Sequence, residues 1–318
     1  MNNLDGFLTP IQSQVQQFIG HGKKHLVYEY ITNFTNIDIK MDKKINIEKL
    51  IIKQNETIIY LFLTFNENFP ETLENIFYIN NQLITKYIAI TYNPIIIHPP
   101  LQGNHWYAAD GPSNDSSHRT VIINHLIPQR FAIDFIQYGS EGLTYGDPLI
   151  NHNYYAYKQP ILSVVNGKVI ALKTNIPDNI PAKGGSTIPG QHDLDNLAGN
   201  YIILFTNHCY ILYAHLSPNS ITVKVGDPVN VGQILGLLGN SGNSEFPHLH
   251  FQIMQSSNPS PLNGQGIPWH MTEFMQENYF IISMHQTIPI PYKIKITDTQ
   301  LIKNEIIMDK MLVSFKVN

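Results

Sequence analysis

Charged residues and cysteine are scarce in this sequence, and its basic residues form no run. Aspartate, glutamate, lysine and arginine make up 14% of the 318 residues, and the formal net charge is −4. Because no basic stretch is available to neutralise phosphates, we do not expect a nucleic-acid partner. The single cysteine, Cys209, excludes an internal disulfide and a metal site built from several thiolates.

Long apolar stretches are also missing. No segment reaches the roughly 18 consecutive apolar residues that a transmembrane helix needs, so we expect no transmembrane segment. Residues 1–6 lack the basic start and the apolar core of a signal peptide. Three alternatives therefore stay open for the location of the protein: the chain remains inside the cell, a signal peptide was removed before residue 1, or the chain is exported without such a signal.

Hydrophobic residues are abundant enough for a substantial core, at 43% of the sequence. A chain of this length is expected to form two domains, and one large β domain is the alternative. Alternating apolar and polar residues predict strands over 25–31, 37–41, 57–63 and 86–92. These strands indicate a β-sandwich-like domain over 22–96. An N-terminal segment, 1–21, precedes it, and apolar residues at helical spacing predict a helix over 8–20.

A second β-rich region follows a loop-like linker over 97–117. Its candidate strands are 118–123, 130–136, 161–165, 168–172, 201–205, 209–215, 221–223 and 248–254. A C-terminal extension over 257–318 is mixed, with a helix expected over 269–279 and strands over 292–297 and 311–317. The predicted fold class is therefore mainly β, with a sandwich-like domain followed by an antiparallel β domain over 118–256.

Two histidines stand two residues apart in this second region, at His248 and His250. Side chains at this spacing share a face only if the backbone is extended, and strand rise then places them about 6–7 Å apart. One imidazole can bind a metal ion while the other handles protons. A pair of surface histidines would give the same pattern.

The histidine pair ends an ordered series of motifs. They are Tyr213-Ala214-His215-Leu216, Val225-Gly226-Asp227-Pro228-Val229, Gly239-Asn240-Ser241-Gly242-Asn243-Ser244 and Pro247-His248-Leu249-His250-Phe251. The series resembles the core of the lysostaphin-type zinc endopeptidases of the peptidoglycan-cleaving metallopeptidase family. The resemblance extends over 118–256 and implies a compact antiparallel β domain with an open groove.

The resemblance also implies functional roles. His250 corresponds to a zinc ligand, and His215 and His248 correspond to catalytic histidines. Asn200 lies in a strand that resembles one of the family and is expected to line the groove as a substrate-binding residue. One Zn²⁺ ion, a peptidoglycan peptide as partner, and export to the periplasm, the cell surface or the medium follow as expectations.

The remaining ligands of the family come from a His-x-x-x-Asp motif, which this chain matches only in part. Asp134 falls at the aspartate position, but Arg130 falls where histidine is expected. A guanidinium offers no lone pair and stays charged, so Arg130 cannot bind a metal. Arg130 could instead bind a substrate carboxylate or form an ordinary ion pair.

Two explanations of this departure stay open: the site is degenerate, or another histidine supplies the ligand. If residues 118–123 and 130–136 form a hairpin centred on residue 126, His118 lies opposite Asp134, within reach of the same ion. His125 would lie in the turn, where exposure to solvent is expected. The combination of Ser116-Ser117-His118-Arg119 with residues 130–134 also resembles some bacterial members, which favours His118.

The sequence therefore predicts a zinc endopeptidase that uses metal-activated water to hydrolyse peptide bonds in peptidoglycan stems or cross-links. Its expected ligands are His118, Asp134 and His250. The alternative is a catalytically degenerate relative that binds cell wall or a protein partner.

Overall fold

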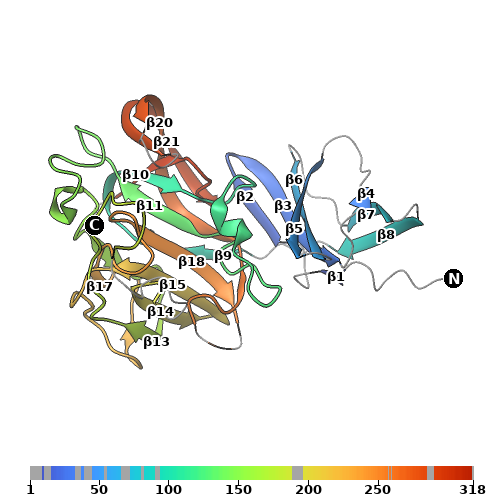
Figure 1. Cartoon of the computed structure of the whole chain (residues 1–318), viewed down its shortest axis with the longest axis horizontal. Coiled ribbons are helices and arrows are strands. Elements are labelled where there is room, and N and C mark those ends of the chain that lie inside the picture. The colour runs from blue at the N-terminus through green and yellow to red at the C-terminus, as the bar shows by residue number, and fades with distance from the viewer. Residues whose placement is uncertain are drawn as a thin grey trace. The chain divides into compact units, whose positions relative to one another are not determined.

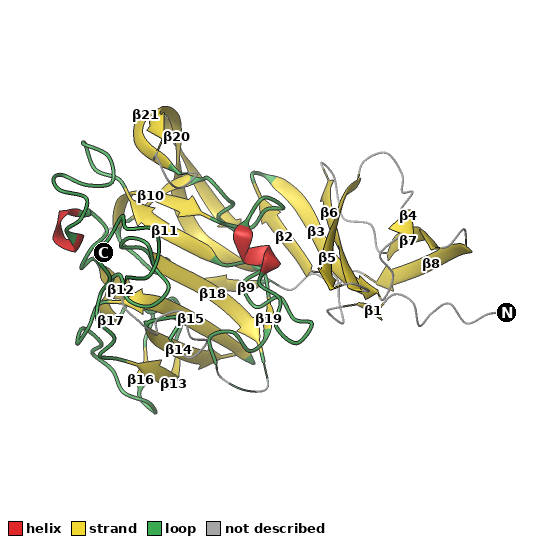
Figure 2. Cartoon of the chain, viewed as in Figure 1, coloured by secondary structure: helices red, strands yellow, loops and turns green. Residues whose placement is uncertain are grey.

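The computed structural model is built almost entirely of β-strands (Figures 1 and 2). It describes residues 9–10, 16–32, 37–38, 45–53, 56–65, 72–79, 82–89, 94–187, 196–256, 258, 260–284 and 290–316. Within these ranges the helices are two short 3-10 turns, η2 (Ser117–Thr120) and η3 (Asn151–Asn153). None of the helices described there has the length and apolar character to cross a membrane. The predicted mainly-β fold class is confirmed.

The chain divides into two compact units, the first formed by residues 1–95 with 122–126 and the second by 96–121 with 127–318. The first unit holds two antiparallel sheets. The larger sheet contains β1 (Thr9–Pro10), β2 (Gln16–Gly20), β3 (Lys23–Thr32), β5 (Ile45–Lys53) and β6 (Glu56–Phe65). The smaller contains β4 (Ile37–Asp38), β7 (Thr72–Ile79) and β8 (Gln82–Ala89). Leu26 and Val27 point to opposite faces of β3 and are both buried, so both faces of this strand are covered.

The helix expected over 8–20 is wrong where the structure describes that segment. Residues Gln16–Gly20 form β2, which pairs with β3 in an antiparallel hairpin. The connecting residues, His21 and Gly22, have φ values of 52° and 66°. Positive φ at both central positions is the geometry of a tight two-residue hairpin turn. This turn chemistry, together with burial of Phe18, overrides the helical spacing.

The second unit is organised around a large antiparallel sheet with the strand order β16-β13-β14-β15-β18-β11-β10-β22-β20-β21, in which β19 pairs with β18 and β9 with β20. Its strands are β9 (Ile95–Ile97), β10 (Gly103–Ala109), β11 (Ile133–Gln137), β13 (Gly167–Lys173), β14 (Asn200–Thr206), β15 (Cys209–Leu216), β16 (Pro228–Val229), β18 (Leu249–Gln255), β19 (Gln265–Gly266), β20 (Trp269–Met284), β21 (Pro291–Glu305) and β22 (Leu312–Phe315). A separate pair is formed by β12 (Pro160–Leu162) and β17 (Ile234–Leu237). Figure 1 shows β11, β18, β15 and β14 side by side.

Several expected elements in this unit differ from the structure. The strand expected over 118–123 is replaced by η2, and 221–223 lies outside any strand. Residues 103–109, expected in a loop, form β10. The helix expected over 269–279 is wrong because these residues belong to β20, which pairs with both β21 and β22. Pairing along a long hairpin outweighs the helical propensity of this methionine- and glutamate-containing segment.

Alternation along β18 separates a core face from a groove face. Phe251 points into the core, where its ring lies 5.4 Å from the rings of Tyr213 and Trp269. His250, one residue earlier, points to the opposite face, as strand geometry requires. The aromatic core thereby anchors the strand that carries the expected metal ligand.

In the loop before β18, the backbone at Gly242 passes close to the backbone at Gly199. Gly242 has φ of 79°, and a Cβ atom there would lie 2.3 Å from the backbone nitrogen of Gly199. We expect Gly242→Ala to destabilise the protein by about 2 kcal/mol more than Gly226→Ala, since both changes strain a positive φ but only the first also causes a clash. At Gly226, φ is 98° and no atom lies within 4 Å of the added Cβ.

Thermal unfolding followed by near-ultraviolet circular dichroism would measure this difference, because Trp106 and Trp269 are both buried in the second unit. Equal Tm values for the two variants would show that the close approach of Gly242 to Gly199 tolerates a side chain.

Candidate metal and catalytic site

A carboxylate and an imidazole face each other across two neighbouring strands. Asp134 of β11 and His250 of β18 are direct partners in the antiparallel register. Directly opposed side chains share a face of the sheet. His250 Nδ1 lies 2.8 Å from Asp134 Oδ1. The sheet itself therefore sets the distance between these two groups.

His118 reaches the same point from a loop. Its hairpin placement opposite Asp134 is wrong, because β11 pairs with β10 and Ala109 is the residue opposite Asp134. His118 instead lies in η2, whose first turn is capped by the side chain of Ser116. His118 Nδ1 lies 2.9 Å from the carbonyl oxygen of Asp110, and its Nε2 lies 3.5 Å from Asp134 Oδ2.

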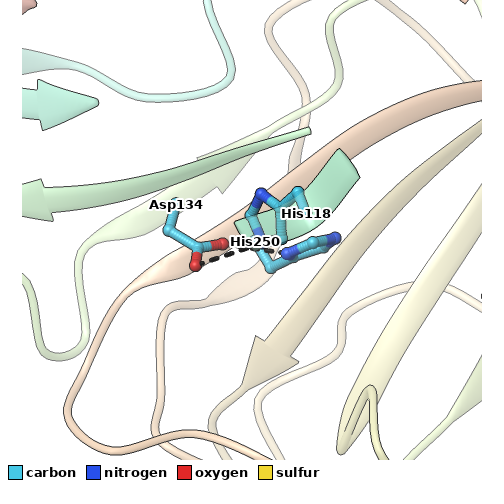
Figure 3. A group of neighbouring side chains, drawn as sticks. All are labelled: His118, Asp134 and His250. Carbon is cyan, nitrogen blue, oxygen red and sulfur yellow. Dashed lines mark hydrogen bonds and ion pairs between the residues drawn. The ribbon is translucent and has the colours of Figure 1, made fainter. Parts of the chain in front are cut away.

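His118, Asp134 and His250 each offer one ligand atom, and these atoms lie within 4.8 Å of one another (Figure 3). Two imidazoles and one carboxylate form a donor set that suits catalytic zinc, which keeps a further position open. A carbonyl oxygen can only accept, so the contact of His118 Nδ1 with Asp110 leaves the lone pair of its Nε2 facing the cluster. The three residues thus fit a zinc ion.

Mutual electrostatics stabilise this cluster when no metal is bound. Burial lowers the pKa of His118, but attraction to Asp134 outweighs it and raises the pKa to about 9. Burial raises the pKa of Asp134, but the charge of His118, the charge that His248 gains at low pH, and hydrogen bonds from His118 and His250 hold it well below its usual value. The carboxylate therefore stays ionised beside a protonated imidazole, whose proton a cation can replace.

His215 and His248 stand next to the three candidate ligands. Their ring centroids lie 4.7 Å apart, and His215 lies 5.9 Å from His250. His215 Nδ1 lies 2.7 Å from the carbonyl oxygen of Ser241, and His248 Nδ1 lies 2.8 Å from that of Phe246. Each contact keeps a proton on Nδ1 and leaves Nε2 as the acceptor.

Both of these histidines are neutral near pH 7. Burial lowers the pKa of His215 well below 6.5, and the nearby His248 and His250 lower it further. Burial is also the largest effect on His248 and lowers its pKa. Neutral imidazoles beside a candidate metal site can accept protons.

One groove of about 560 Å³ is lined by the three candidate metal ligands and the two neighbouring histidines, that is by His118, Asp134, His250, His215 and His248. Sequence reasoning missed its other wall, which comes from the C-terminal extension. That wall includes Pro261, Leu262, Ile290, Asp309 and Lys310. No motif in the extension marks these positions, which lie in turns and bends outside its strands.

The two residues expected to bind substrate lie outside the groove wall. Arg130 is 1% exposed and donates to the carbonyl oxygen of Ser113 at 3.1 Å and to Asn114 Oδ1 at 3.4 Å. Asn200 is fully buried and joins the backbone of Ile176 to that of Leu216. Neither side chain is available to a substrate in this arrangement.

Comparison with known proteins gives a partial match. Residues 154–263 match Peptidase family M23, a stretch that includes His215, His248 and His250 and begins after His118 and Asp134. The glycyl-glycine endopeptidase ALE-1 of Staphylococcus capitis is 56% identical over 45 residues, covering 14% of this chain and 12% of that protein. The peptidoglycan DD-endopeptidase ShyA of Vibrio cholerae serotype O1 is 33% identical over 104 residues, or 32% of this chain and 23% of that protein.

Among solved structures, the catalytic domain of the antimicrobial peptidase lysostaphin from Staphylococcus simulans is 26% identical, with a TM-score of 0.26. The similarity covers 40% of this chain and 86% of that domain. The chain spans only 17 to 23% of the length of the first curated relatives that it matches.

The raised pKa of His118 predicts how stability depends on pH in the metal-free protein. The pKa rises from 6.5 to about 9 on folding. The stabilisation, at most about 3 kcal/mol, is complete below pH 6.5 and is lost as the pH rises through 9. His215 and His248, whose pKa values are lowered, destabilise the fold only as the pH falls below 6.5.

Urea unfolding of metal-free protein at pH 6.5 and pH 9 would measure this loss. We expect it to be much smaller in His118→Asn and unchanged in His125→Asn, a control in the same stretch of sequence. An equal loss in all three proteins would contradict the pairing of His118 with Asp134.

Proposed function

We propose that this chain, which carries a Peptidase family M23 domain over residues 154–263, is a zinc-dependent endopeptidase that hydrolyses peptide bonds in peptidoglycan stems or cross-links. One observation carries the proposal. The ligand atoms of His118, Asp134 and His250 lie within 4.8 Å of one another, in the groove that His215 and His248 also line. Because peptidoglycan lies outside the cytoplasm, we propose that the protein acts there.

His118 Nε2, the Asp134 carboxylate and His250 Nδ1 would hold the ion. When bound, zinc supplies a Lewis acid that activates water and polarises a carbonyl group. The chain's part is to fix the donors: the sheet sets Asp134 against His250, and the carbonyl of Asp110 orients His118.

His215 and His248 supply the proton transfers. Each is neutral, and its Nδ1 faces a backbone carbonyl, so Nε2 can accept the proton that the attacking water loses. The protonated imidazole can then return this proton to the amine released when the peptide bond breaks. Two imidazoles with ring centroids 4.7 Å apart can share these roles at one scissile bond.

The contacts of Arg130 favour the explanation that His118 supplies the first metal ligand over the explanation that the site is degenerate. Arg130 occupies the position where the family resemblance places histidine, and its guanidinium binds the backbone of Ser113 and the side chain of Asn114. That segment leads directly into η2 and His118. The same side chain that cannot bind zinc thus holds the loop that delivers the replacement ligand.

Metal content tests the ligand set. We expect about one zinc per chain, lost in His250→Ala and His118→Ala and retained in His125→Ala, because His125 is outside the cluster. Inductively coupled plasma mass spectrometry on folded variants would measure it. A wild-type protein with no affinity for added zinc would favour the non-catalytic binding module, and zinc retained by His118→Ala would refute His118 as a ligand.

The proton-transfer roles have a separate test. His215→Ala and His248→Ala should each retain zinc but lower kcat by about 10²–10⁴-fold, the usual contribution of a general acid or base. Release of new amino groups from purified peptidoglycan would measure the rate. Full activity in either variant would remove that histidine from the mechanism.

A further inference from the structure

We infer that Gln252 is a positioning residue that holds His250 in the tautomer and orientation needed to bind a metal ion through Nδ1. The inference rests on the proposed function, since it concerns the same candidate ligand. Gln252 lies two residues after His250 on β18, so the two side chains share the groove face of the sheet. Gln252 is 1% exposed, and its Oε1 lies 2.9 Å from His250 Nε2.

The surroundings of Gln252 determine which way its amide points. Its Nε2 donates to the carbonyl oxygen of Pro261 at 2.9 Å and to Met254 Sδ at 3.4 Å. Neither of these groups can donate, so the amide nitrogen must face them and the amide oxygen must face His250. A reversed amide would set two acceptors against each other at Pro261.

The orientation of the Gln252 amide determines which ring nitrogen of His250 carries a proton. The Gln252 oxygen can only accept, so His250 Nε2 must donate and therefore carries a proton. Metal binding needs the lone pair of a neutral imidazole, and with the proton held on Nε2 this lone pair lies on Nδ1, the nitrogen that faces Asp134 at 2.8 Å. When a cation takes the place between Nδ1 and the carboxylate, Gln252 keeps the remaining proton on Nε2.

The other histidines of the site are oriented by backbone carbonyls, but His250 needs a side chain as its hydrogen-bond partner because of its place in the fold. His118, His215 and His248 each contact a backbone carbonyl, from Asp110, Ser241 and Phe246 respectively. Those carbonyls lie in loops or at strand ends. His250 lies within β18, between β11 and β15, where backbone carbonyls are directed along the sheet to neighbouring strands. A side chain on the same face is the partner that remains.

Gln252 also joins the candidate ligand to the groove wall. Pro261, which accepts from the Gln252 amide, and Leu262 both line the groove. Movement of this wall segment would therefore act on the orientation of His250 through one amide group. Gln252 would hold the second nitrogen of a metal-binding histidine. Removing a partner of this kind typically lowers metal affinity 10–100-fold.

Three variants separate the acceptor from the packing role. Gln252→Leu removes the hydrogen bonds to His250, Pro261 and Met254, and Gln252→Glu keeps an acceptor for His250 but loses the donor to Pro261. Ile253→Val is the control, a buried change in the same strand on the opposite face. We expect the zinc dissociation constant, measured by chelator competition, to rise 10–100-fold in Gln252→Leu. It should stay at or below the wild-type value in Gln252→Glu, because a carboxylate is the stronger acceptor, and should not change in Ile253→Val.

The metal-free proteins give a second readout, the ¹⁵N spectrum of histidine-labelled protein. It should show a proton held on His250 Nε2 in the wild type and Ile253→Val, and its loss or exchange in Gln252→Leu. Unchanged zinc affinity in Gln252→Leu would overturn the inference, as would Gln252→Glu as weak as Gln252→Leu. A wild-type protein that binds no zinc would instead refute the proposed function, and the ¹⁵N spectrum would still decide the role of Gln252.

Discussion

The contact between Asp134 and His250 is the constraint on which the rest of the site depends. It follows from the register of β11 against β18, so any shift of one residue would turn one of the two side chains into the core. The aromatic packing of Phe251 on the opposite face resists such a shift. The other members of the cluster come from loops and strand ends, and each is oriented against this fixed pair.

Sequence patterns were most informative where local geometry decides the outcome. The spacing of His248 and His250 predicted a shared strand face, and the motif series predicted that His215 would join them, as the ring distances show. The hairpin spacing also predicts His118 beside Asp134, but β11 pairs with β10 instead, and His118 reaches that position through η2. Loop paths of this kind depend on long-range contacts such as those of Arg130 with Ser113, which no periodicity encodes.

Other features could not be predicted because their signals are weak or conflicting. The segment 269–279 has helical propensity and becomes a strand only because β21 and β22 lie beside it. The burial of Arg130 and Asn200 could not be inferred from their polarity, which suggested a role at the surface of the groove. Gln252 was available to sequence reasoning, since it continues the alternation that begins at His248 and His250.

The position of β22 has a consequence for how small a stable fragment of this chain can be. β10 pairs with β11 on one side and with β22 on the other, so β22 protects the edge of the strand beside Asp134. A fragment ending at residue 256 would leave the backbone donors and acceptors of β10 exposed, which favours self-association between molecules. The boundary of the autonomous folding unit therefore lies well beyond the region in which the motifs are found.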